Sequence, residues 1–134
     1  MAFYMLDSDI CSYVMKRSSS ALLERLARAP VPDVCMSVVT RAELLYGVRI
    51  SPHRTRDAEA LRGLLTYVEV LDFPEQAAED YAEIRSDLKG RGALIGANDL
   101  LIAAHARSLG LTLITNNTDE FSRVEGLALE NWTS

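Results

Sequence analysis

The chain has 134 residues, 49% of them hydrophobic, and a formal net charge of −5. This length and composition predict a single domain over residues 1–134 with a buried core. No stretch approaches the roughly 18 uninterrupted apolar residues of a membrane-spanning helix, and the acidic balance disfavours nonspecific nucleic-acid binding.

The N-terminal apolar run is interrupted by Asp7, which is too early for a signal peptide. Cys11 and Cys35 are the only cysteines, and they lack the paired spacing of metal ligands. Because both stand among apolar neighbours, we expect reduced thiols in the core of a cytoplasmic protein.

Short apolar runs alternate along the chain with segments of helical periodicity. Helix boundaries are expected at capping residues and at proline or glycine. We expect five strands, over residues 2–6, 34–39, 68–73, 111–115 and, for a short last one, 127–130. Between the first two strands we expect a helix to about Met15, capped by Ser8 or Asp9, and a helix that starts at 18–20 and ends before Pro30. The remaining helices are expected to Ile50 with Thr40 as the cap, over 56–67, over 74–90, and over 98–109 with Asn98 as the cap.

Strands that alternate with helices predict an α/β fold. We expect a parallel sheet of four or five strands, covered by helices on both faces. Ligands of such sheets bind beyond the carboxyl ends of the strands. Asp7 follows the first expected strand and residues 115–117 follow the fourth, so both should lie at the same edge.

Three acidic residues stand in apolar surroundings. Asp7 follows an apolar run, Glu43 lies within the mostly apolar stretch 38–48, and Asp99 precedes the apolar run 100–104. If folding gathers them in one pocket, their oxygens suit a hard cation, because buried carboxylates need a compensating charge. Each also has an ordinary interpretation: a helix cap, a surface glutamate and a first-turn acid favoured by the helix dipole.

Arginine supplies 12 of the 14 basic residues, and a basic stretch lies in the middle of the chain. It contains Arg49, His53, Arg54 and Arg56 and has no acid before Asp57. The stretch is either a solvated loop or a phosphate contact, for which the planar guanidinium is suited.

Four segments together resemble a known family. They are residues 4–13 (YMLDSDICSY), 40–47 (TRAELLYG), 98–106 (NDLLIAAHA) and 113–121 (LITNNTDEF). In order and spacing they are similar to the motifs of PIN-domain ribonucleases, and more narrowly of the VapC toxins of type II toxin–antitoxin modules. The resemblance runs from residue 3 to about Trp132.

This resemblance implies a PIN-like fold and a Mg²⁺-dependent endoribonuclease that cleaves structured RNA. Asp7, Glu43 and Asp99 would be the catalytic acids that hold Mg²⁺, or Mn²⁺ in its place. Thr115 and Asn116 would orient the scissile phosphate or water molecules. Some VapC toxins cut transfer RNA in the anticodon loop, including initiator transfer RNA, and others cut ribosomal RNA; the residues do not choose between these targets.

The chain departs from the family pattern at two places. Asp9 stands where many relatives carry asparagine, and Asn117 falls where many PIN domains place a fourth aspartate. The additional metal ligand would then be Asn117 itself or, in its place, Asp119 or Glu120. The sequence leaves this choice open, as it does the number of metal ions.

Membership would also imply partners. A VapC-like toxin is expected to be inhibited by a VapB-type antitoxin, whose tail lies across the active site, and to form a homodimer. Apolar residues that offer a pairing surface are Leu44, Leu45, Leu64 and Tyr67.

Two alternatives remain. Leu6 to Asp9 also resembles the start of haloacid-dehalogenase-type phosphatases, but these need a later lysine at a strand end, and Lys89 falls in an expected helix. The other alternative is a catalytically silent PIN-like binding module, which the intact set of Asp7, Glu43 and Asp99 disfavours.

Overall fold

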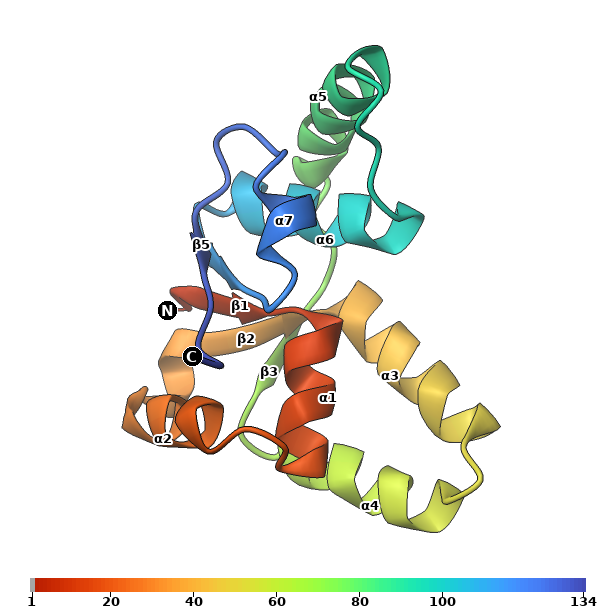
Figure 1. Ribbon diagram of the computed structural model, residues 1–134, viewed down its shortest axis with the longest axis vertical. Coiled ribbons are helices and arrows are strands. Elements are labelled where there is room, and N and C mark those ends of the chain that lie inside the picture. Colours follow the sequence, from red (N-terminus) through yellow and green to blue (C-terminus); the bar gives the residue numbers. More distant parts are fainter. Residues whose placement is uncertain (1) are drawn as a thin grey trace.

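The computed structural model describes residues 2–134, which form a twisted central sheet between two layers of helices (Figure 1). The strands are β1 (Tyr4–Leu6), β2 (Val34–Ser37), β3 (Glu69–Leu71), β4 (Thr112–Ile114) and β5 (Leu129–Glu130). The helices are α1 (Ser8–Lys16), α2 (Ser20–Arg28), α3 (Val38–Ile50), α4 (Arg54–Leu65), α5 (Ala77–Gly90), α6 (Ala97–Ser108) and α7 (Thr118–Phe121), with one 3-10 turn over Val31–Asp33.

The sheet has the order β3-β2-β1-β4-β5, and all its pairings are parallel. Leu6 at the end of β1 is in register with Met36 of β2 and with Ile114 of β4. The carboxyl ends of the three central strands therefore meet at one edge. The predicted parallel sheet of four or five strands is confirmed, with five.

Alternate residues of each central strand enter opposite halves of the core. Met5 and Leu113 pack with α5, α6 and α7, whereas Leu6 and Ile114 pack with α1, α2 and α4. Figure 1 shows these two helix groups above and below the sheet. Burial on both faces explains why the central strands are mostly apolar.

Five predicted helix starts were wrong by one to three residues. Helices α4 and α5 begin at Arg54 and Ala77, rather than at about 56 and at 74. Asp7 caps α1, rather than Ser8 or Asp9. Ser37 caps α3 by accepting the N–H of Val39 at 3.1 Å, so the helix begins before Thr40 and the strand ends earlier than expected. Gly96, not Asn98, precedes α6. Neither α7 nor the 3-10 turn was predicted, because both are single turns.

The four-residue pairing surface expected for a homodimer is also wrong in part. Leu44 and Leu64 are 8% and 2% exposed and belong to the core. Leu45 and Tyr67 are 40% and 37% exposed. Leu45 is instead joined on α3 by two more exposed apolar side chains, Tyr46 and Ile50.

No helix among residues 2–134 combines the length and apolar character needed to cross a membrane. The two cysteines, Cys11 and Cys35, are free and buried, as expected.

Candidate functional site

Asp7 lies at the carboxyl end of β1, where its backbone N–H extends the ladder to the carbonyl oxygen of Ile114 at 3.0 Å. Its side chain is only 3% exposed and accepts the N–H of Ile10 at 2.8 Å. The hydroxyl of Thr115 also donates to it. The pKa of Asp7 is raised to about 7. Burial is the main cause, the charges of Asp9 and Asp99 add to it, and the two hydrogen bonds act in the opposite direction.

Asp99 lies in the first turn of α6 and is half-buried. Its pKa is raised to about 6, mainly by burial and in addition by the like charges of Glu120, Glu43 and Asp9. Glu120 is close enough for its carboxyl group to share a hydrogen bond with that of Asp99. The amide of Asn117 in turn donates to Glu120 at 2.9 Å.

Glu43 comes from the second turn of α3 and is partly buried. The hydroxyl of Ser8, the residue after Asp7, donates a hydrogen bond to the Glu43 carboxylate. This bond joins α1 to α3 across the carboxyl edge of the sheet. Glu43 and Asp99 are within electrostatic range of one another, since the charge of Glu43 contributes to the raised pKa of Asp99.

The structure thus gathers Asp7, Glu43, Asp99 and Glu120 from four separate segments, with Asp9 exposed at the rim. Of the two acids that the sequence left open, Glu120 reaches the cluster. Asp119 is exposed and is not among the charges that raise the pKa of Asp99. Asp119 and Glu120 are distinguished by the sides of α7 from which they project, and this helix was not predicted from the sequence.

Thr115 and Asn116 are both hydrogen-bonded within the protein. The Thr115 hydroxyl is completely buried, where it donates to Asp7 and accepts the N–H of Asn117 at 2.9 Å. Asn116 donates to the Tyr13 hydroxyl at 3.2 Å and accepts from Thr133 at 3.1 Å. Thr115 therefore orients Asp7, and Asn116 is bonded to the C-terminal segment; the predicted role of both residues in orienting phosphate or water stays a prediction.

A divalent cation fits the chemistry of this cluster. The donors are all carboxylate oxygens, which Mg²⁺ and Mn²⁺ prefer. Among the described residues, no Lys or Arg is one of the groups that shift the pKa of Asp7 or Asp99, so the acidic charge lacks a cationic partner. Within residues 2–134, however, no three His, Cys, Asp or Glu side chains converge tightly enough to ligate one ion in the conformations seen. Binding would require these side chains to turn inward.

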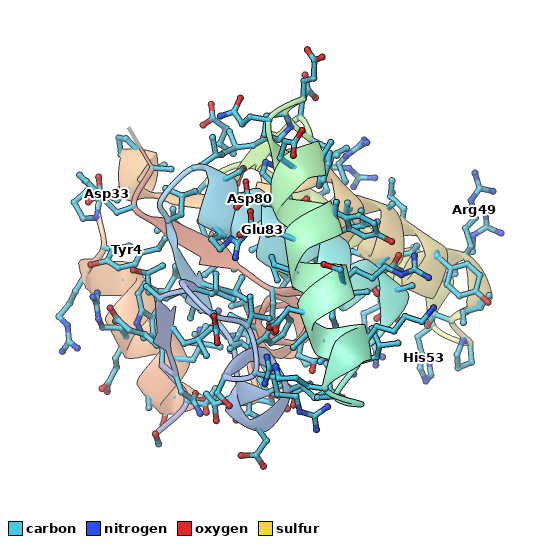
Figure 2. The ribbon with its side chains drawn as sticks, turned by 90° about the horizontal axis from the view of Figure 1, so that it is seen from above. Tyr4, Asp33, Arg49, His53, Asp80 and Glu83 are labelled. Carbon is cyan, nitrogen blue, oxygen red and sulfur yellow. The ribbon has the colours of Figure 1, made fainter. Side chains whose placement is uncertain are left out.

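The basic stretch lies apart from the acids, at the ends of α3 and α4 that face each other. Arg49 is in the last turn of α3, His53 precedes α4, and Arg54 and Arg56 are in its first turn. All four are exposed, and Figure 2 shows Arg49 and His53 at one end of the molecule. Arg56 nevertheless lines a cleft of about 500 Å³ between α1, α3 and α4 that Ser8 and Glu43 also line.

The lysine that a phosphatase of the haloacid-dehalogenase type would need is not at a strand end. Lys89 lies in the last turn of α5 and is exposed.

Comparisons with known proteins agree with these features. The family model described as PIN domain matches residues 4–127. The chain is similar to Ribonuclease VapC2 of Haemophilus influenzae, with 41% identity over 98% of this chain and 99% of the relative. It is also similar to the tRNA(fMet)-specific endonuclease VapC of Shigella flexneri, with 38% identity over 99% and 100% of the two chains.

Among solved structures, a chain of VapBC2 from Rickettsia felis, crystallised with a DNA fragment from its promoter, superimposes with a TM-score of 0.91. It is 36% identical, and the match covers 98% of this chain and 99% of that chain. Full-length similarity in both sequence and fold, together with the acidic cluster at the sheet edge, leads to one assignment. The chain belongs to the PIN-domain family and, within it, to the VapC ribonucleases.

Proposed function

We propose that this protein is a Mg²⁺-dependent endoribonuclease and the toxin of a type II toxin–antitoxin pair. The observation that carries the proposal is the gathering of Asp7, Glu43, Asp99 and Glu120 at one edge of the sheet without a compensating cation. Similarity to ribonucleases supports RNA cleavage as the reaction, and the acidic cluster supports metal binding as its basis.

In this proposal Asp7, Glu43, Asp99 and Glu120 hold the ion. Held there, the ion would supply neutralisation of the phosphodiester charge, polarisation of the phosphoryl oxygen and a lowered pKa for water at the site. Mn²⁺ can take its place because it uses the same oxygen ligands.

The chain's own residues restrain the acids near the edge of the sheet. Asp7 is rigid because Ile10 and Thr115 donate to it. Ser8 restrains Glu43, and Asn117 restrains Glu120. These bonds limit the movement that each acid needs to reach a metal ion, and small displacements of catalytic groups are costly in rate.

The proposed substrate is a structured RNA, with initiator transfer RNA as the first to test. The support is the name of the Shigella flexneri relative, which acts on tRNA(fMet) and matches this chain over its whole length. The cleft is lined by both Glu43 and Arg56, so an RNA strand bound along it would have a phosphate near Arg56 at a position beyond the acidic edge.

The proposed partner is a VapB-type antitoxin, supported by the VapBC complexes to which the fold is similar. A basic antitoxin side chain could pair with the acids, since burial strengthens a charge-assisted bond. A homodimer is also proposed, and the exposed Leu45, Tyr46 and Ile50 of α3 provide apolar surface for protein contacts.

Cleavage by the purified protein tests the activity. Initiator transfer RNA should be cut in the presence of Mg²⁺ or Mn²⁺ and spared after chelation, and Asp99→Asn should remove cleavage. Asp72→Asn is the matched control, because Asp72 is an exposed acid outside the cluster. Sequencing RNA ends after induction identifies the cellular target.

A silent binding module would leave RNA intact with every metal, and normal growth upon expression of soluble protein without an antitoxin would reject the toxin assignment.

A further inference from the structure

Two arginines fasten the segment after α7 to the loop between α5 and α6. Nη1 of Arg123 donates to the carbonyl oxygens of Ala93 and Leu94, at 3.3 and 3.4 Å. In return, Nη2 of Arg91 donates to the carbonyl oxygen of Arg123 at 2.7 Å. Each segment therefore supplies a guanidinium to the backbone of the other, and we call this reciprocal contact of Arg91 and Arg123 the arginine clasp.

The clasp is anchored on α5. The guanidinium of Arg91 binds Asp87 through two bonds, from Nη2 at 2.7 Å and from Nε at 3.2 Å. This contact holds the pKa of Asp87 below its usual value. The bidentate geometry directs the remaining N–H groups of Arg91, and a lysine could not reproduce it.

Both ends of the clasp lead directly to acids of the cluster. The backbone N–H of Arg123 donates to the carbonyl oxygen of Glu120 at 3.1 Å. On the other side, the loop held at Ala93 and Leu94 continues to Gly96, after which α6 brings in Asp99. The clasp thus spans the segment that carries Asp99 and the segment that carries Glu120, whose charge helps to raise the pKa of Asp99.

Glu120 needs such support because α7 is only four residues long. A single helical turn has little stability of its own, since helix nucleation is unfavourable. Asn117 restrains the Glu120 side chain, but it lies at the start of the same turn. A further attachment follows at Glu125, whose carbonyl oxygen accepts from Arg107 at 3.0 Å, while Arg107 itself is paired with Asp80 at 2.6 Å.

We propose that Arg123 and Arg91 are positioning residues, which set the distance between Asp99 and Glu120 and thereby the affinity of the site for a divalent cation. The inference rests on the proposed function, because it takes these acids as metal ligands. Neither arginine touches the substrate or the ion in this role; each acts through backbone that carries an acid.

Loss of position and loss of charge have opposite effects here. Arg123 carries a positive charge, and removing a positive charge from the protein can only favour the binding of a divalent cation. Loss of the clasp should weaken metal binding, because Asp99 and Glu120 would no longer be held together. The direction of the change therefore separates the two effects.

Calorimetric titration of the folded full-length protein with Mn²⁺ tests the inference. Arg123→Ala should bind Mn²⁺ on the order of tenfold more weakly, as for other groups that orient metal ligands. Arg123→Lys should lose less, because an ammonium group retains a donor for one carbonyl oxygen. Arg28→Ala, which removes an exposed arginine of α2, should bind as the wild type does.

The kinetics should agree with the titration. In Arg123→Ala, KM for RNA should be unchanged, and raising the Mg²⁺ concentration should recover most of kcat. If Arg123→Ala does not fold, Arg91→Ala carries the same expectation, since it removes the anchor and leaves the Arg123 side chain in place.

Unchanged or tighter Mn²⁺ binding by Arg123→Ala, or by Arg91→Ala in its stead, overturns the inference. Asp99→Asn in the same titration distinguishes the two levels of failure. If Asp99→Asn loses Mn²⁺ binding and the arginine variants do not, only the arginine clasp is rejected. If Asp99→Asn binds Mn²⁺ as the wild type does, the proposed metal site itself is wrong.

Discussion

Ser8 and Glu43 are joined by a hydrogen bond from hydroxyl to carboxylate that connects the first residue of α1 with the second turn of α3. Ser8→Ala should free the Glu43 side chain without disturbing the core, because Ser8 is only partly buried. Hydrogen bonds to charged groups contribute about 1.5–3 kcal/mol, so we expect kcat/KM for RNA to fall on the order of tenfold. Steady-state cleavage at fixed Mg²⁺ measures the effect.

Ser86→Ala is the control for this substitution. Ser86 is exposed on α5 and donates only to the carbonyl oxygen of Glu83 within its own helix. An equal loss in both variants, or no loss in Ser8→Ala, would show that Ser8 does not hold Glu43 for catalysis.

Asp7 makes the metal-free protein less stable as the pH rises. Its pKa is about 7 in the folded state against 3.8 for the ordinary group, so the folded state holds the proton more tightly. The contribution of Asp7 to the free energy of unfolding is therefore greatest below pH 4, falls as the pH rises through 7, and is constant above that. The total change is on the order of 4 kcal/mol.

Asp7→Asn should remove most of this pH dependence and should stabilise the metal-free protein at pH 8. Asparagine is the suitable replacement, because it can still cap α1, whereas Asp7→Ala would also lose the cap at a cost of about 1 kcal/mol. Urea unfolding with a chelator from pH 4 to 8 gives the comparison. Parallel stability curves for wild type and Asp7→Asn would contradict the raised pKa.

Gly96 leaves room for the side chain of Asp99. A Cβ atom at Gly96 would lie 3.3 Å from Oδ2 of Asp99, closer than carbon and oxygen normally approach. Since the φ of Gly96 is −58°, alanine suits its backbone, and Gly96→Ala should act mainly by displacing the carboxylate. We expect kcat to fall on the order of tenfold, with the fold retained.

Gly63→Ala is the comparison for Gly96→Ala. A Cβ atom at Gly63 meets nothing within 4 Å, and the position is inside α4, so this variant should gain up to about 1 kcal/mol of stability and keep full activity. Full activity in Gly96→Ala would show that the Asp99 carboxylate tolerates displacement.

The basic stretch should contribute to RNA affinity rather than to turnover. Replacing Arg54 and Arg56 with alanine should weaken RNA binding and reduce the slope of log affinity against log salt by about one unit per lost phosphate contact. Binding measured at several salt concentrations tests this. The control is the double variant of Arg28 and Arg62, two exposed arginines elsewhere on α2 and α4. Identical slopes in both double variants would show that Arg54 and Arg56 are ordinary solvated surface charges.

The fold could be predicted because local signals agreed with the tertiary structure. Errors arose where two local signals competed. Val38 and Val39 extend the β-branched run of β2, but Ser37 caps the backbone there, and both valines enter the first turn of α3. The burial of Leu44 beside the exposed Leu45 could not be predicted, because α3 is apolar on more than one side.

The site was less predictable than the sheet. Asp7 could be placed from the strand that it follows, and Asp99 from the apolar helix that it begins. The choice of Glu120 over Asp119 depends on the phase of a single turn, and a change of one residue rotates a side chain by about 100° around a helix. The contacts from Ser8, Arg91 and Arg123 link segments far apart in the chain, so a local sequence pattern cannot predict them.

The central position of β1 has a consequence for the timing of activity during synthesis. β1 is the first strand to leave the ribosome, yet one of its two neighbours is β4, which is made near the end of translation. A nascent chain therefore carries Asp7 for most of its synthesis without Thr115 to orient it or Glu120 to complete the cluster. The acidic cluster can therefore be completed only after the C-terminal segment has left the ribosome.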